Sequence, residues 1–187
     1  MRIVAGKHRG RPIEAPPGEA IRPTSDRARQ ALFNILTHRF LRGDGTPELV
    51  GARVLDGFAG TGALGLEALS RGAAHVTFMD KDPAAILAIG ANLRRCAENK
   101  NADVLRCDVT NPPPARQACA IALLDPPYRS LLAAPALRGL QRQGWLAPQA
   151  LVSFEEAAKE PFAPPPGFTL LDERRYGAGR LIFLRAP

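Results

Sequence analysis

Short apolar runs that alternate with helix-compatible segments restrict the fold of this chain more than any other feature. The apolar runs span residues 53–56, 75–80, 102–108, 120–125 and 150–154. Between them, residues 62–70, 83–98 and 131–143 have the composition of helices. An order of strand, helix, strand favours βαβ units, in which the strands lie parallel and helices cover the sheet. The sequence therefore predicts an α/β fold with a mostly parallel sheet.

Two further apolar runs near the C-terminus are separated only by a short turn. Residues 168–174 and 180–185 flank the sequence Tyr-Gly-Ala-Gly at 176–179, and its glycines suit a tight reversal of the chain. This pattern predicts an antiparallel hairpin at an edge of the sheet. Together with the five earlier runs, the hairpin predicts a seven-stranded sheet.

A helix is also predicted before the alternating region. Its apolar residues recur at spacings of three and four: Ala28, Ala31, Leu32, Ile35 and Leu36. Thr24, Ser25 and Asp26 offer side-chain oxygens that can cap its N-terminus. We therefore divide the chain into a basic N-terminal extension with this helix, residues 1–48, and a main domain, residues 49–187.

Basic residues are concentrated in the N-terminal extension. Residues 1–42 hold nine Lys and Arg against three Asp and Glu, so they carry +6 of the net charge of +7. Lys7, His8, Arg9 and Arg11 form the densest cluster. Such an asymmetry favours contact with a polyanion, and a solvated run of charges is the alternative for the extension taken alone.

The length of 187 residues fits a single domain with a substantial hydrophobic core. No apolar run approaches the roughly 18 residues that span a membrane, and no apolar segment of a secretory signal follows the basic N-terminus. We therefore expect a cytoplasmic protein. Cys96, Cys107 and Cys119 fit neither a disulfide framework nor a zinc motif, so we predict buried or free thiols and no metal site.

Four of the apolar runs end in aspartate, at Asp56, Asp80, Asp108 and Asp125. Open α/β sheets bind ligands beyond the carboxyl ends of their strands. A single aspartate in such a position is commonly only solvated. Four at successive strand ends predict a crevice lined with carboxylates.

A glycine-rich turn follows the first of these aspartates. Gly60 and Gly62 let the backbone turn tightly and approach a ligand closely, and the predicted helix that follows offers unpaired N–H groups. Residues 60–65 satisfy the pattern G-x-G-x-x-G, and Asp80 lies 20 residues past Gly60, as does the ribose-binding acid of NAD-dependent dehydrogenases. A nucleotide-like cofactor is therefore predicted at this turn.

Asp56 discriminates between two classes of cofactor. A carboxylate directly before the loop repels a pyrophosphate. It suits the ammonium and sulfonium groups of S-adenosylmethionine, which carries no phosphate. The turn therefore favours a methyl donor, and a dehydrogenase is the rival interpretation.

The tetrapeptide Asp125-Pro126-Pro127-Tyr128 ends the fourth apolar run. Its prolines fix the backbone and lack N–H donors, so the oxygens of this turn act as acceptors. Asp125 and the carbonyl of Pro126 can accept both hydrogens of an exocyclic amine on a nucleobase, while Tyr128 stacks on the base. A proline-rich surface turn is the alternative, and the preceding cofactor loop favours amine binding.

These motifs, in this order, resemble those of S-adenosylmethionine-dependent amino methyltransferases. The segments 22–27, 60–70 and 144–146 are further similar to the RsmD family, which methylates the N2 amine of a guanine in small-subunit ribosomal RNA. The resemblance runs from Arg2 to about Arg185. It implies a Rossmann-like class I methyltransferase fold.

The resemblance also implies a role for each motif. Asp56 and the loop with Phe58, Gly60 and Gly62 would hold the methionine part of S-adenosylmethionine, and Asp80 would bind the ribose hydroxyls. The remaining assignments are Asp108 for the adenine amine, Lys81 with its aliphatic stem over the adenine, and Asp125, Pro126 and Tyr128 for the target base and catalysis. We expect RNA contacts from Lys7, Arg9, Arg11, Arg22 and Arg27.

Three functions therefore stay open. The first is a ribosomal RNA guanine-N2 methyltransferase. An adenine-N6 methyltransferase is the enzymatic rival, because the tetrapeptide recognises an amine and not a particular ring. A noncatalytic RNA-binding module with the same fold is the rival of another class. The expected partner is ribosomal RNA or a small-subunit assembly particle, with no membrane, and the expected state is a monomer.

Overall fold

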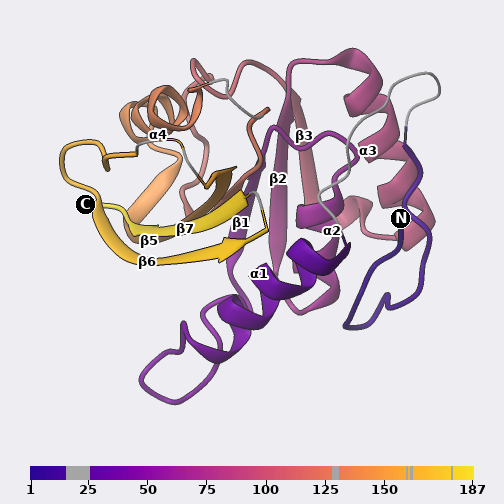
Figure 1. Cartoon of the computed structure of the whole chain (residues 1–187). Helices are drawn as coiled ribbons and strands as arrows, with labels where there is room; N and C mark the ends of the chain where they lie inside the picture. The colour runs from indigo at the N-terminus through magenta and orange to yellow at the C-terminus, as the bar shows by residue number, and fades with distance from the viewer. Residues whose placement is uncertain (16–25, 128–130, 159, 161, 178) are drawn as a thin grey trace.

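A seven-stranded sheet forms the centre of the molecule (Figure 1). The computed structural model describes residues 1–15, 26–127, 131–158, 160, 162–177 and 179–187, and of Asp26 and Arg27 only the backbone. The strands are β1 (Arg53–Gly57), β2 (His75–Asp80), β3 (Ala102–Arg106), β4 (Cys119–Leu124), β5 (Leu146–Ala157), β6 (Thr169–Tyr176) and β7 (Gly179–Arg185). Their spatial order is β3-β2-β1-β4-β5-β7-β6.

The pairing of the strands confirms the predicted topology. β3, β2, β1, β4 and β5 run parallel to one another, whereas β7 lies antiparallel between β5 and β6. The predicted C-terminal hairpin is therefore present at the edge of the sheet, and β6 is its outer strand. Alternating residues of each central strand face opposite sides, so both faces of the sheet carry an apolar core.

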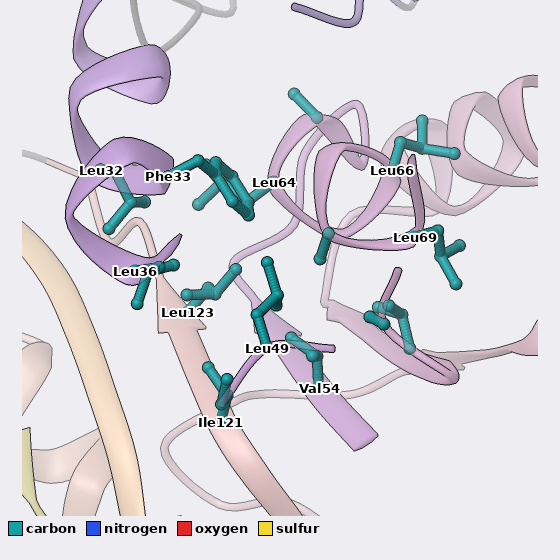
Figure 2. Packing of buried hydrophobic residues seen from close by; sticks show 14 of the residues in the cluster. Leu32, Phe33, Leu36, Leu49, Val54, Leu64, Leu66, Leu69, Ile121 and Leu123 are labelled. Atoms are coloured by element: carbon teal, nitrogen blue, oxygen red, sulfur yellow. The ribbon is translucent and has the colours of Figure 1, made fainter. Parts of the chain in front are cut away.

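Helices cover both faces of the sheet. α1 (Asp26–His38), α2 (Ala63–Ser70) and α3 (Pro83–Cys96) contribute to one core, and α4 (Ala133–Arg142) contributes to the other. A short 3₁₀ helix, η1 (Asn99–Asn101), follows α3. Figure 2 shows Leu32, Phe33 and Leu36 of α1 packed toward Leu64 and Leu123. The apolar spacing of the predicted N-terminal helix is thus explained by burial, while Thr24 and Ser25, its predicted caps, lie outside the described residues.

Most predicted boundaries differ from the observed ones by one to four residues. β3 ends at Arg106 because the carboxylate of Asp108 accepts the N–H of Thr110 at 2.8 Å and starts a turn. β5 extends from Leu146 to Ala157, beyond the predicted 150–154, because Leu146 pairs with Cys119 of β4 and residues 155–157 pair with β7. α2 begins at Ala63, since Gly62 adopts a left-handed conformation with φ of +78°.

The three cysteines lie in or near the hydrophobic core. Cys96 and Cys119 are buried, Cys107 is half-buried, and all three are free thiols, as predicted. Burial raises the pKa of the Cys119 thiol to about 11. Within the described part of the chain, each helix is too short or too polar to cross a membrane.

The N-terminal segment, residues 1–15, packs on the face of the sheet that α1, α2 and α3 cover (Figure 1). Ile3 and Ile13 are buried in the same core as α1, α2 and α3. The backbone N–H of Lys7 donates to the carbonyl of Ser70 at 2.9 Å, at the end of α2. The basic segment is therefore anchored by its apolar residues and its backbone.

Glu67 of α2 is the centre of this anchor. Its side chain is fully buried, and its two carboxylate oxygens accept the backbone N–H groups of Val4 at 2.7 Å and Ala5 at 3.0 Å. The Nε of Arg71 donates to it at 2.7 Å, and the Nε of the fully buried Arg29 in α1 lies 3.7 Å away. One carboxylate therefore joins the N-terminal segment, α1 and α2.

We predict that Glu67→Ala lowers the free energy of unfolding by about 3–5 kcal/mol, because it removes a buried carboxylate beside Arg29 and Arg71 and leaves the N–H groups of Val4 and Ala5 without their acceptor. Urea denaturation followed by circular dichroism measures the change. The control Asp103→Ala removes an exposed partner of His75 and changes the stability by less than about 1 kcal/mol. Equal losses in the two variants would contradict the role of Glu67.

Candidate active site

The strand order reverses its direction between β1 and β4, and this reversal positions the candidate site. Chain segments leave the two strands toward opposite sides, which opens a crevice beyond their carboxyl ends. Asp56 is the penultimate residue of β1, and Asp125 directly follows β4. The N–H of Asp125 donates to the carbonyl of Gly57 at 3.2 Å. Asp80 ends β2 and Asp108 lies just beyond β3, so all four aspartates stand at this edge.

The glycine-rich loop is held by two of these aspartates. Asp56 Oδ2 accepts the N–H of Gly65 at 2.7 Å, and Asp80 Oδ2 accepts the N–H of Gly60 at 2.8 Å. A Cβ at Gly65 would lie 2.3 Å from Cε1 of Phe78, whereas a Cβ at Gly60 would meet nothing within 4 Å. The loop is therefore packed tightly against β2 at Gly65 and open at Gly60, where a ligand can approach the backbone.

Phe58 at the start of this loop has a strained backbone. Its φ of +59° lies in the left-handed region, which bulky residues rarely adopt. Its half-buried side chain packs against the core on the α4 side of the sheet. The aromatic ring is thus placed beside the glycine loop at the cost of local strain, a combination that is common at ligand-binding sites.

Asp56 carries an acceptor atom to which no described residue donates a hydrogen bond. The residue is only 1% exposed, and its Oδ1 has no hydrogen-bond partner in the described part of the chain. Burial raises the pKa of Asp56 well above its ordinary value, and the charges of Asp125 and Asp80 raise it further, against the opposing hydrogen bond from Gly65. A cation in the crevice would stabilise the ionised carboxylate.

Asp80, Lys81 and Asp108 form the other end of the crevice. Asp80 Oδ1 accepts the N–H of Asp82 at 2.9 Å, so each of its oxygens already has one partner and one remaining lone pair. Asp108 is exposed, and its hydrogen bonds to Thr110 hold the pKa of its carboxyl below the ordinary value, with a smaller contribution from the charge of Lys81. Both carboxylates therefore present acceptors to a ligand with hydroxyl or amine donors.

Asp125 borders a hollow on the α1 side of the sheet. The hollow is small: of about 260 Å³ of space between atoms, which includes open solvent, about 10 Å³ has room for the centre of a water molecule. Its lining comes from five elements and the turn after β4: Ala28, Leu32, Leu64, Leu124, Asp125, Ser153, Phe154, Glu155 and Leu181. Pro126 is buried beside it, and Tyr128 lies outside the described residues.

The predicted RNA-binding residues are only partly described. Lys7 is exposed and its Nζ lies 2.7 Å from Glu98 Oε1, while Arg11 donates to the carbonyl of Arg95 at 2.7 Å. Arg9 is exposed next to them. Arg22 and the side chain of Arg27 lie outside the described residues. The structure therefore brings Lys7, Arg9 and Arg11 to one surface beside the C-terminal end of α3.

Sequence reasoning missed Ser153 and Glu155, which line the hollow from β5. Glu155 stands near the carboxyl end of a parallel strand, as the four aspartates do, and the same rule could have identified it. The predicted strand ends at Phe154, one residue before Glu155. Among the described residues, no group of three or more His, Cys, Asp or Glu is arranged to hold a metal ion.

Comparisons with solved structures define the class of this fold. A putative methyltransferase from Escherichia coli superimposes with a TM-score of 0.80 at 33% identity, covering 100% of this chain and 97% of that one. A putative methylase from Haemophilus influenzae gives a TM-score of 0.78 at 32% identity, covering 98% and 97%. The chain thus has the Rossmann-like methyltransferase fold that the sequence resemblance implied.

Comparison with curated sequences identifies the family. The chain is 36% identical to the ribosomal RNA small subunit methyltransferase D of Haemophilus influenzae over 95% of this chain and 89% of that protein. It is 37% identical to the Escherichia coli K12 protein of the same name over 83% and 74%. Residues 1–185 match the family described as Conserved hypothetical protein 95. The chain belongs to this family, which confirms the resemblance to RsmD.

We predict that Asp56→Asn raises the melting temperature at neutral pH. A carboxyl whose pKa is raised by folding destabilises the fold increasingly from its ordinary pKa up to the raised pKa, and has no such effect below the ordinary pKa. The gain of the variant over the unmodified protein therefore shrinks as the pH falls through the pKa of Asp56. Thermal unfolding from acidic to neutral pH measures it, and a gain independent of pH would contradict the prediction.

The control for this measurement is Asp44→Asn. Asp44 Oδ1 accepts the N–H of Thr46 at 2.9 Å, and this hydrogen bond lowers the pKa of its carboxyl. A lowered pKa stabilises the fold at neutral pH, and the contribution is lost as the pH falls. The control therefore shows the opposite sign, with a loss of stability at neutral pH that disappears in acid.

Proposed function

We propose that this protein transfers a methyl group from S-adenosylmethionine to the exocyclic N2 amine of a guanine in small-subunit ribosomal RNA. One observation carries the proposal: Asp125 stands at the switch point of the sheet, where its N–H donates to the carbonyl of Gly57 directly before the glycine-rich loop. The names of the curated relatives support the choice of RNA. The substrate is this RNA, free or within a small-subunit particle.

The residues of the crevice fit S-adenosylmethionine. Oδ1 of Asp56 and the neighbouring carboxylates make a strongly acidic site, which suits a cationic ligand and repels a pyrophosphate. Gly60 leaves room for close approach to the loop. When bound, S-adenosylmethionine supplies a methyl group activated on a sulfonium. Asp56, Phe58, Gly60 and Gly62 would hold its methionine part.

The adenosine part would extend toward β2 and β3. Asp80 retains a lone pair on each oxygen for ribose hydroxyls, and the exposed carboxylate of Asp108 can accept the adenine amine. Lys81 is exposed between them, so its aliphatic stem can cover the ring while its charge stays in water. These roles give each carboxylate of the edge a donor group to bind.

Asp125 would act on the target amine by position and charge. The lone pair of an aromatic amine is delocalised into the ring, and accepting its hydrogens at Asp125 and the Pro126 carbonyl favours a pyramidal nitrogen aimed at the methyl group. The nitrogen becomes cationic as it attacks, and the carboxylate of Asp125 stabilises this charge. The methylated nitrogen is then acidic and loses its proton late, so Asp125 need not be a strong base. Tyr128 would stack on the base.

We predict that Asp125→Asn keeps affinity for S-adenosylhomocysteine and lowers methylation by about 10²–10³-fold, because the amide keeps the shape of the side chain and loses its charge. Transfer of a tritiated methyl group to small-subunit RNA measures the single-turnover rate, and mass spectrometry of RNA digests identifies the product. Asp103→Asn, an exposed site on β3, is the control with an unchanged rate. An unchanged rate in Asp125→Asn would refute the assignment.

The same assay separates the proposed function from its rivals. N2-methylguanine as the product supports it, N6-methyladenine would show the adenine enzyme, and RNA binding without transfer would show a noncatalytic module. Calorimetry with NAD tests the dehydrogenase, because tight binding of NAD without binding of S-adenosylhomocysteine would overturn the cofactor assignment.

The basic N-terminal extension, residues 1–48, would supply affinity for RNA. We predict that replacing Lys7, Arg9 and Arg11 by Gln weakens RNA binding and flattens its salt dependence by about 0.7–0.9 units of slope per lost phosphate contact. Affinity for S-adenosylhomocysteine stays the same. Fluorescence anisotropy over a series of salt concentrations measures the slope.

The matched control replaces three exposed arginines that belong to the α4 side of the molecule. Arg116, Arg138 and Arg142 carry the same total charge as the three residues of the extension. Their replacement by Gln should leave the salt slope close to that of the unmodified protein. Equal slopes in the two triple variants would mean that the extension is only a solvated surface.

A further inference from the structure

The basic residues of the N-terminal segment lie at the edge of the sheet opposite the crevice. The parallel strands begin at this edge, and α2 and α3, which start at the crevice, end at it. The N–H of Lys7 donates to the carbonyl of Ser70, the last residue of α2. Arg11 donates to the carbonyl of Arg95 in the last turn of α3, and Figure 1 shows the segment beside this helix. The bases and the crevice therefore lie at opposite ends of the same helices.

The end of α3 adds three bases that the proposed function does not use. Arg94 and Arg95 belong to the last turn of α3, and Lys100 follows in η1. All three residues are exposed. Arg95 Nη2 lies 2.7 Å from Glu14 Oε1, and both side chains of this pair are about half exposed. Water screens such a pair, so it holds the arginine only weakly and another anion can compete for it.

A buried carboxylate joins the N-terminal segment to η1. Glu98 is only 3% exposed, and its Oε1 lies 2.7 Å from Lys7 Nζ and 2.5 Å from His8 Nε2. Its Oε2 accepts a hydrogen bond from the side-chain amide of Asn101 at 2.7 Å. The bases of the two segments are thus held in fixed positions relative to each other. A fixed array of cations suits a rigid polyanion, because little order has to be created on binding.

The composition of this surface decides which part of a nucleic acid it contacts. Residues 1–15 and 83–101 contain no Phe, Tyr or Trp, so no aromatic ring is present on which an unpaired base could stack. Lys and Arg bind phosphate oxygens whatever the base sequence. Double-stranded RNA is recognised mainly by its shape and backbone. The surface therefore fits the backbone of a duplex better than the splayed bases of a single strand.

The length of α3 sets the distance between this surface and the crevice. The 14 residues of α3 span about 20 Å at roughly 1.5 Å per residue. The helix starts three residues after Asp80, which lies at the crevice. Along a duplex, about 20 Å corresponds to roughly six base pairs, since neighbouring phosphates of one strand are about 3.4 Å apart along the axis. A base in the crevice and phosphates on this surface therefore belong to different parts of an RNA.

We propose that residues 2–11, the last turn of α3 and η1 together bind the phosphate backbone of an RNA stem, roughly six or more base pairs away from the target guanine. This assignment rests on the proposed function, which places the guanine at the crevice. The substrate is then a folded RNA that reaches both ends of α3. A short RNA around the guanine makes only the contacts at the crevice.

The test compares RNAs of different length. Once mass spectrometry has located the methylated guanine, RNAs are made that carry it in an unpaired end next to a stem of about 4 or about 12 base pairs, below and above the roughly six that the distance requires. A third RNA replaces the long stem by a single strand of the same length. Fluorescence anisotropy over a series of salt concentrations measures binding to the unmodified protein and to a variant with Arg94, Arg95 and Lys100 replaced by Gln.

We expect the triple variant to flatten the salt dependence with the long stem by about 0.9 units of slope for each lost phosphate contact. With the short stem its slope should equal that of the unmodified protein, because this RNA does not reach the end of α3. With the long single strand the flattening should be smaller than with the long stem. A second variant, with Arg9 and Lys100 replaced by Gln, leaves the last turn of α3 intact and should show the same dependence on stem length.

The matched control replaces Arg116, Arg138 and Arg142 by Gln, which removes the same charge on the opposite face of the sheet. Its slopes should equal those of the unmodified protein on all three RNAs. An unchanged slope of both variants with the long stem, or equal flattening with the long stem and either other RNA, would overturn the proposal. Absence of N2-methylguanine with the unmodified protein would instead overturn the proposed function, and stems of the same two lengths without a target would still test the surface.

Discussion

The contacts of the buried Glu67 carboxylate hold the N-terminal segment, α1 and α2 together, and the packing of this face of the sheet depends on them. The carboxylate pairs with arginines and accepts backbone N–H groups from a segment more than 60 residues away in the chain. A carboxylate without water needs such partners, because desolvation of an unpaired charge is costly. Since α2 also begins at the glycine loop, the contact that anchors the N-terminal segment is in the same helix that shapes the site.

The second constraint is the crowding of acidic groups at the carboxyl edge of the sheet. Burial opposes ionisation of Asp56 and raises its pKa, and the charges of Asp125 and Asp80 add to this effect. The hydrogen bond from Gly65 to Asp56 offsets part of the cost, and the hydrogen bond from Gly60 to Asp80 fixes the start of the loop. The edge is thus preorganised as an acceptor surface, and a cationic ligand would relieve the repulsion between the carboxylates.

Charge is divided between two parts of the molecule. The N-terminal segment presents Lys7, Arg9 and Arg11 beside α3, whereas the crevice is lined by carboxylates. A polyanion is attracted to the first surface and repelled by the second. Under the proposed function, this division would let RNA phosphates bind at the N-terminal segment while an uncharged base enters the crevice.

The sequence by itself determined the α/β class, the seven strands, the C-terminal hairpin and the positions of the four aspartates. Such features depend on the spacing of apolar residues and on the special backbone of glycine and proline, which are local properties. The tertiary structure alone decided that Glu67 joins three segments, and that Ser153 and Glu155 meet Asp125 around one hollow. These contacts depend on strand register and on helix packing across the sheet, which no spacing within one segment specifies.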